Sequence, residues 1–299
     1  MKKLTAATLA LCIATLTGCS SSDDEEELVL PQIVNQFETD VVWQESIGDG
    51  VQHYFSRLTP AVHDDVVYVA NREGLVEALS LENGNTLWQT DVRENASFWP
   101  WETTESAKLS GGILQAYGKI YIGSEHGYLT ALDRETGEIV WRKTMPGEVL
   151  AKPAAGDGLI FVNLASGKLL AVHPDTGEER WRFEQEVPPL TLRGQSSPTV
   201  ANGGVLLGLE TGKLSVLISE NGYSAWSAEI ATPKGASEFE RLVDVDTQAL
   251  ISGPYAYAIA YNGNLAAVDI RSGNVVWKRE YSSYRDLSMD SQSIYVVDS

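Results

Sequence analysis

The chain has 299 residues, 41 acidic and 22 basic side chains, and a formal net charge of −19. An acidic chain without a basic cluster argues against nucleic-acid binding, and it favours solubility and a partner with positive patches. Both cysteines lie within the first 19 residues, so the rest of the chain has no disulfide, cysteine nucleophile or thiolate metal site. The four histidines show no metal-ligand spacing, and we expect neither a metal nor a cofactor.

Residues 1–18 are predicted to be a signal peptide. Lys2 and Lys3 form a positively charged start, and the apolar stretch Leu4–Leu16 is too short for a stable membrane anchor. The sequence Leu16-Thr17-Gly18-Cys19 resembles the bacterial lipobox, in which the cysteine is lipidated and becomes the mature N-terminus. Lipidation of Cys19 is therefore expected, the alternative being an ordinary signal peptide.

Residues 19–35 are predicted to be a lipidated, acidic and flexible tether. The run Asp23–Glu27 contains five consecutive acidic residues, which repel one another and keep the segment extended. In lipoproteins of this type, an aspartate directly after the cysteine favours retention in the inner membrane, and this chain has Ser20 there. The resemblance implies a lipid-anchored protein on the periplasmic face of the outer membrane.

From residue 36 onward, one frame recurs five times: a glycine, a second glycine ten residues later, and a tryptophan four residues after that. The sets are Gly74/Gly84/Trp88, Gly127/Gly137/Trp141, Gly167/Gly177/Trp181, Gly212/Gly222/Trp226 and Gly263/Gly273/Trp277. A short apolar run rich in β-forming residues precedes each set, and we expect these runs to be strands buried on both faces. The runs are Val66–Ala70, Lys119–Ile122, Leu159–Val162, Val205–Leu207 and Tyr255–Ile259.

The spacing of the repeats predicts the fold. Neighbouring repeat tryptophans lie 40 to 53 residues apart, which is enough for four strands of about 5–6 residues with their turns. Four-stranded units of this length stack around an axis as a β-propeller. We therefore predict an all-β propeller of four-stranded antiparallel blades over residues 36–299. Each tryptophan should wedge between adjacent blades, ligand stacking being the alternative.

Both ends of the propeller look incomplete. Trp43 resembles the tryptophan strand of a repeat without the other three strands, and Ile294–Val297 resembles the first half of a sixth repeat. In closed propellers the N-terminal strand often completes the last blade. Roughly 90 further residues would supply the missing strands and give eight blades. We therefore expect about five complete blades, additional partial blades, and a chain shortened at its C-terminus.

Three stretches interrupt the repeat. Arg93–Leu109 contains Phe98-Trp99-Pro100-Trp101, which we interpret as a loop with its own small cluster, an exposed aromatic contact patch being the alternative. Val187–Arg193 and Pro233–Thr247 are irregular connections.

The glycine and tryptophan frame resembles the tryptophan-docking repeat of quinoprotein-type propellers. WD40 propellers are a poorer match, because no aspartate follows any repeat tryptophan. Within this group, the lipobox and three further segments resemble the BamB family, the propeller lipoproteins of the outer-membrane β-barrel assembly machinery. These segments are Leu190–Gly194, Glu240–Thr247 and Ala260–Leu265. The resemblance extends over essentially the whole chain.

The resemblance implies a non-catalytic scaffold that helps outer-membrane proteins fold and insert. The implied partners are the POTRA region of BamA, the other subunits of the machinery and, less directly, unfolded outer-membrane proteins. The family's contact surface lies on an L-x-L-R loop and a D-x-D loop. These motifs match Leu190, Leu192 and Arg193, and Asp244 and Asp246.

The residues themselves are compatible with that assignment. Two leucines and an arginine on an irregular connection offer an apolar anchor with a charged tip, a composition typical of binding hot spots. Asp244 and Asp246 place two carboxylates on one side of an extended segment, where they can hold Arg193 or accept a basic residue from a partner. Alternatively, the leucines cap the propeller core and the aspartates cap turns.

Two other functions use the same fold. A quinoprotein dehydrogenase needs a quinone, a calcium ion and a catalytic aspartate, and it commonly carries a vicinal disulfide. This chain has no Cys-Cys pair and no candidate calcium cluster. A generic cell-envelope propeller would bind sugar or peptide, for which the aromatic residues Phe98–Trp101 are the one indication.

Overall fold

The computed structural model describes residues 37–54, 56–93, 105–192 and 195–298. The chain divides into two compact units, residues 1–41 and 42–299, and every strand belongs to the second. All regular elements in the described ranges are β-strands. No helix that could cross a membrane occurs in this part of the chain.

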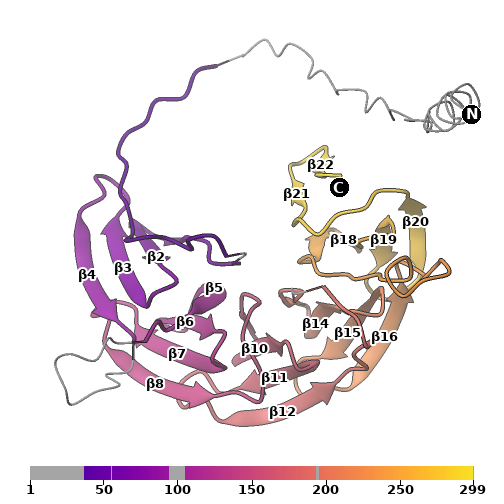
Figure 1. Cartoon of the computed structure of the whole chain (residues 1–299), viewed down its shortest axis with the longest axis horizontal. Coiled ribbons are helices and arrows are strands. Elements are labelled where there is room, and N and C mark those ends of the chain that lie inside the picture. The colour runs from indigo at the N-terminus through magenta and orange to yellow at the C-terminus, as the bar shows by residue number, and fades with distance from the viewer. Residues whose placement is uncertain (1–36, 55, 94–104, 193–194, 299) are drawn as a thin grey trace, which may run out of the picture. The chain divides into compact units, whose positions relative to one another are not determined.

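Five antiparallel sheets of four strands follow one another along the second unit, and each is a simple meander of consecutive strands (Figure 1). We call them blades 1 to 5. The strands are, for blade 1, β1 (Ala61–His63), β2 (Val66–Ala70), β3 (Leu75–Ser80) and β4 (Thr86–Asp91); for blade 2, β5 (Leu109–Ala116), β6 (Lys119–Ser124), β7 (Tyr128–Asp133) and β8 (Ile139–Thr144); for blade 3, β9 (Ala154–Gly156), β10 (Leu159–Leu164), β11 (Lys168–Val172) and β12 (Glu179–Glu184); for blade 4, β13 (Thr199–Ala201), β14 (Gly204–Gly208), β15 (Lys213–Ile218) and β16 (Ser224–Glu229); and for blade 5, β17 (Leu250–Ser252), β18 (Tyr255–Ile259), β19 (Leu265–Asp269) and β20 (Val275–Arg279).

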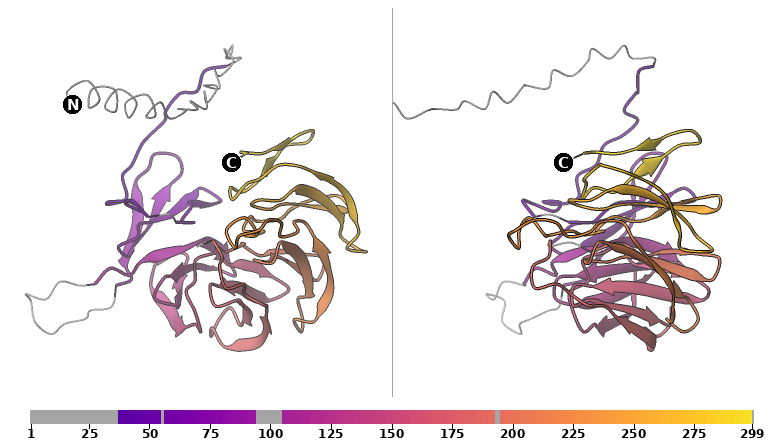
Figure 2. Two further views of the ribbon diagram at one scale, coloured as in Figure 1. Left: turned by 45° about the vertical axis from the view of Figure 1, so that its right-hand side comes forward. Right: turned by 90° about the vertical axis from the view of Figure 1, so that its right-hand side faces the viewer.

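A sixth sheet has two strands, β21 (Ser288–Met289) and β22 (Ile294–Tyr295). Within residues 42–299, the first strands of neighbouring blades contact one another, as β1 and β5 or β9 and β13 do. The fourth strands lie on the outside of the row of blades (Figures 1 and 2). The segments that lead into the first strands therefore gather at the inner side of the blades.

The apolar runs form the second strand of each blade, as predicted. In β6 and β10, every residue after the first is buried, because neighbouring blades cover both faces of these strands. The fourth strands are more exposed, as β8 illustrates, since they form the outer edge of each blade. The prediction of an all-β propeller with five complete blades and further partial ones is confirmed.

In each of the first four repeats, the tryptophan docks on the next blade. Its indole N–H donates to the backbone carbonyl oxygen of the residue three positions before the second glycine of the following repeat, so a wedge between blades is confirmed. Trp43, the isolated tryptophan, docks on blade 1 in the same way. The pairs are Trp43 with Leu81 (2.8 Å), Trp88 with Arg134 (2.9 Å), Trp141 with Pro174 (3.0 Å), Trp181 with Ser219 (2.9 Å) and Trp226 with Ile270 (2.8 Å).

The second glycine of each set is needed for this contact as well as for its turn. Gly177 has φ +66°, and a Cβ atom there would lie 2.8 Å from the ring of Trp141. Gly158 has a similar φ of +77°, but a Cβ atom there would meet nothing within 4 Å. The two glycines therefore separate the cost of the backbone conformation from the cost of the blade contact.

Gly177→Ala should destabilise the protein considerably more than Gly158→Ala. Both variants place a side chain in the left-handed region, at a cost of about 1–2 kcal/mol, whereas only Gly177→Ala also overpacks the indole, which costs about 1–3 kcal/mol more. Urea unfolding followed by tryptophan fluorescence measures the difference. Equal losses of stability in the two variants would contradict a packing role for the glycine.

Candidate functional site

Both aspartates of the D-x-D motif are buried. Asp244 and Asp246 lie in the connection between β16 and β17 and are each 3% exposed. The segment is extended and crosses to blade 5, where the backbone N–H of Tyr261 donates to the carbonyl oxygen of Asp244 (2.7 Å). Val243 and Val245 pack into the apolar core between blades 4 and 5. The valines fix the segment, and the aspartates consequently point into the interior.

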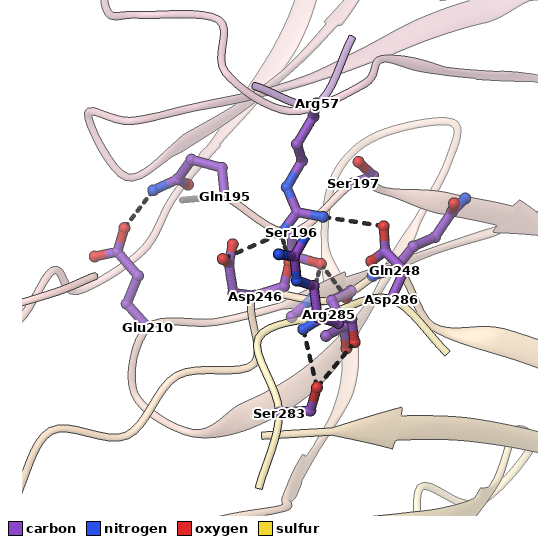
Figure 3. A network of polar contacts seen from close by, with 12 residues as sticks. Arg57, Gln195, Ser196, Ser197, Glu210, Asp246, Gln248, Ser283, Arg285 and Asp286 are labelled. Carbon is purple, nitrogen blue, oxygen red and sulfur yellow. Dashed lines mark hydrogen bonds and ion pairs between the residues drawn. The ribbon is translucent and has the colours of Figure 1, made fainter. Parts of the chain in front are cut away.

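Arg57 pairs with Asp246. Arg57 precedes β1 and stands 189 residues before Asp246 in the sequence. Its Nη2 atom lies 3.1 Å from Oδ2 of Asp246, and the same atom donates to the backbone carbonyl oxygen of Asp246 (2.8 Å). Its Nη1 atom donates to Oδ2 of Asp286 (3.0 Å), and Oδ1 of Asp286 accepts the N–H of Gln248 (2.8 Å). Figure 3 shows Arg57 between the two carboxylates. The sequence suggested Arg193 or a basic residue of a partner as the cation beside these aspartates. Arg193 lies outside the described residues, and within them Asp246 pairs with Arg57.

The buried carboxyl groups titrate at unusually high pH. Burial raises the pKa of Asp244 to about 8, with further increases from the nearby charges of Asp246 and Glu210. Burial also raises the pKa of Asp246 to about 6, because the loss of hydration outweighs the attraction of Arg57. The pKa of Glu210 is raised by burial too, and the hydrogen bond from Gln195 opposes this shift.

These shifts predict that the folded protein becomes less stable as the pH rises from 5 to 8. In this range the folded state binds more protons at Asp244 and Asp246 than the unfolded state does, so the free energy of unfolding falls with pH, by up to about 1.4 kcal/mol per pH unit for one group. Urea unfolding at pH 5, 6, 7 and 8 measures the slope. Asp244→Asn removes one of the titrating groups and should flatten the profile. A profile of unchanged slope in that variant would contradict the assignment.

The leucine motif lies on the connection between β12 and β13. Leu190 is 36% exposed, and Leu192 is half-buried. Leu190 lines a pocket of about 310 Å³ together with Pro188 and Pro189 on its own connection and, among others, Arg241 and Leu242 on the facing one. The structure therefore brings the leucine loop and the segment before Asp244 to one surface.

One polar contact joins these two loops, and a second joins the leucine loop to the turn between β14 and β15. The hydroxyl of Ser196 donates to the carbonyl oxygen of Thr247 (2.9 Å), directly after the D-x-D motif. The side-chain amide of Gln195 donates to Oε1 of Glu210 (2.5 Å), and Glu210 also lines the pocket (Figure 3). Because Ser196 follows the leucine motif closely, its bond to Thr247 ties the position of the leucine loop to that of the D-x-D segment.

Sequence reasoning missed several residues of this site. Arg57, Glu210 and Asp286 belong to no local sequence motif. The exposed residue Phe239 could have been noticed from its place in an irregular connection. Cys19, Arg193 and the aromatic residues 98–101 lie outside the described part of the chain. Within that part, no group of three or more histidine, cysteine, aspartate or glutamate side chains is placed to hold a metal ion.

The family model described as "Outer membrane protein assembly factor BamB" matches residues 31–100 and 75–299. The chain belongs to the BamB family. Curated members include the outer membrane protein assembly factors BamB of Alteromonas naphthalenivorans (48% identical, 97% of this chain and 73% of the relative), Vibrio cholerae (43%, with 95% and 72% covered) and Escherichia coli K12 (38%, with 96% and 74% covered).

Solved structures show the same fold. BamB from Moraxella catarrhalis superposes with a TM-score of 0.71 at 24% identity, covering 80% of this chain and 69% of that one. The quinohemoprotein alcohol dehydrogenase from Comamonas testosteroni has a TM-score of 0.60 at 17% identity, with 77% and 43% covered. The same fold thus occurs in the BamB family and in an enzyme, so the fold by itself does not decide between them.

Proposed function

We infer that this protein is an outer membrane protein assembly factor, without catalytic activity, that works within the outer-membrane assembly machinery. The observation that carries this conclusion is the match to curated BamB proteins at 38–48% identity along nearly the whole chain. The dehydrogenase alternative has only a likeness of fold at 17% identity. The other alternative, a cell-envelope propeller that binds sugar or peptide, is supported only by the aromatic residues Phe98–Trp101 in the sequence, because residues 94–104 lie outside the described chain.

We propose that the partner surface is built from Leu190, Leu192 and Arg193 and from the exposed segment that faces them. Phe239 is 78% exposed on that facing segment, next to Arg241 and Leu242. Exposed apolar side chains around a pocket with arginines beside them are typical of binding hot spots. The family resemblance points to the POTRA region of BamA as the occupant.

Asp244 and Asp246 belong to this proposal in a supporting role. Both side chains are buried beneath the surface, and Asp246 is engaged by Arg57. Their contribution to partner binding comes from holding the segment that carries Phe239 and Leu242 in place. In the same proposal, a lipid on Cys19 and the acidic segment after it hold the propeller at the periplasmic face of the outer membrane.

Calorimetry with the matching POTRA fragment tests the proposed function. The chain from residue 20 onward, without lipid, should bind the fragment with one-to-one stoichiometry. Leu81→Ala is a suitable control, because Leu81 is 41% exposed on the turn between β3 and β4, outside the proposed surface, and this variant should bind like the parent. Absence of any binding heat at micromolar concentrations would remove the POTRA proposal.

A further inference from the structure

One position near the start of each blade follows a pattern that the sequence motifs do not reveal; it lies just before the first strand in most sheets and inside the first strand in blade 2. The strand pairing defines equivalent residues, because in every sheet one residue of the first strand faces a tyrosine, phenylalanine or leucine of the second. The equivalent pairs are Ala61 with Tyr68, Leu114 with Tyr121, Ala154 with Phe161, Thr199 with Leu206, Leu250 with Tyr257 and Ser288 with Tyr295. Two residues earlier stand Thr59, Gly112, Lys152, Ser197, Gln248 and Asp286.

These equivalent positions converge on one cavity. Five of the six residues line a hollow of about 340 Å³, together with Ser56, Arg57, Tyr284 and Arg285. The sixth, Gly112, leaves space for its neighbours: a Cβ atom there would lie 2.6 Å from Cβ of Lys152 and 3.1 Å from the carbonyl oxygen of Arg57. The volume is that of a small-molecule site. Four of the five blades and the two-stranded sheet therefore contribute lining residues to one polar pocket, and blade 2 contributes the glycine that leaves room for them.

The cavity is basic, although the chain carries a net charge of −19. Its charged lining residues are Arg57, Lys152, Arg285 and Asp286. Arg57 is held by Asp246 and Asp286. Lys152 and Arg285 form no ion pair with any other described residue, and burial lowers the pKa of the Lys152 ammonium group. Two cationic groups thus remain without a carboxylate around a space that a ligand can fill.

Neutral groups in the wall can complete an anion site. The backbone N–H of Lys152 donates to Oγ of Ser197 (3.2 Å), and Ser197 is 4% exposed. This bond uses an acceptor position of the hydroxyl and leaves its hydrogen free to donate. Thr59 and Gln248 add a second hydroxyl and an amide to the same wall.

We propose that this cavity binds a small organic or inorganic molecule with at least two anionic oxygen groups, carboxylates or phosphates, held by Lys152 and Arg285. A guanidinium group and an ammonium group both form strong charge-assisted hydrogen bonds to such oxygens. An anion also offsets the cost of burying the Lys152 ammonium. The site is separate from the leucine pocket, since the two share no lining residue.

Titration calorimetry at constant ionic strength tests the proposal with the full chain. Tricarballylate represents the carboxylates, pyrophosphate represents the phosphates, and acetate serves as the monovalent comparison. One of the two polyvalent probes should bind at a single site, and Lys152→Met and Arg285→Gln should each weaken it at least tenfold. Lys278→Met is the matched control, because Lys278 is exposed on β20, and it should bind like the parent.

A second measurement does not depend on the variants. Amine-reactive labelling followed by mass spectrometry should modify Lys152 in the free protein, and the bound probe should protect it while Lys278 continues to react. Absence of saturable binding by both polyvalent probes up to 10 mM (roughly −2.7 kcal/mol) would overturn the proposal. Equal weakening in Lys278→Met, or labelling of Lys152 that neither probe reduces, would overturn it as well.

Discussion

Arg57→Ala should lower the free energy of unfolding by about 3–5 kcal/mol at pH 8, because it leaves the buried carboxylate of Asp246 without its cation. The loss should be clearly smaller at pH 5, where Asp246, with a pKa of about 6, is already largely protonated. Urea unfolding of the variant and the parent at both pH values measures the two differences.

Two comparisons make this expectation specific to the pair. Arg182→Ala removes an arginine from an exposed ion pair with Glu179, and it should leave the unfolding midpoint unchanged. The double variant Arg57→Ala with Asp246→Ala should be more stable than Arg57→Ala alone, since no buried charge is then left unpaired. A destabilisation by Arg57→Ala that is the same at pH 5 and pH 8 would show that Arg57 acts through packing or through its pair with Asp286, and not through Asp246.

Leu190→Ala and Asp246→Ala should both weaken binding to the POTRA fragment, but by different routes. Leu190 is exposed at the pocket, so its truncation should cost about 2–4 kcal/mol of binding free energy while the thermal midpoint stays within a degree or two. Asp246 is buried against Arg57, so its removal should lower binding and thermal stability together. Calorimetry combined with circular dichroism melting separates the two effects.

The contrast between these two variants has its own control. Asp246→Asn keeps the shape of the side chain and one hydrogen-bond acceptor for Arg57, so it should retain more binding than Asp246→Ala. If Asp246→Ala abolished binding without any loss of stability, the carboxylate would have to reach the partner directly, and its burial would not describe the bound state. If Leu190→Ala lowered stability as much as Asp246→Ala, Leu190 would belong to the core.

The sequence by itself determined the architecture, because the propeller is encoded by local spacing. The interval from glycine to glycine to tryptophan places a turn, a strand and an indole in the same order in every repeat, and Trp141 shows that the indole meets the turn of the following blade. Short apolar runs such as Leu159–Val162 form the buried second strands, because both faces of these strands are apolar and are removed from water by the neighbouring blades. The two irregular connections were also visible as breaks in the repeat, and the resemblance at Leu190–Gly194 and Glu240–Thr247 indicated the BamB family.

Only the tertiary structure decided which side chains meet. Arg57 and Asp246 are 189 residues apart, and no spacing rule predicts which residue lies opposite another across the inner side of successive blades. Burial of the two aspartates was equally hidden, since the D-x-D pattern is compatible with an exposed strand and with a buried one. Thr59, Lys152, Ser197 and Gln248 look unrelated in sequence, because each stands in a different local context. They form one cavity because the equivalent positions of these four blades lie around the same centre.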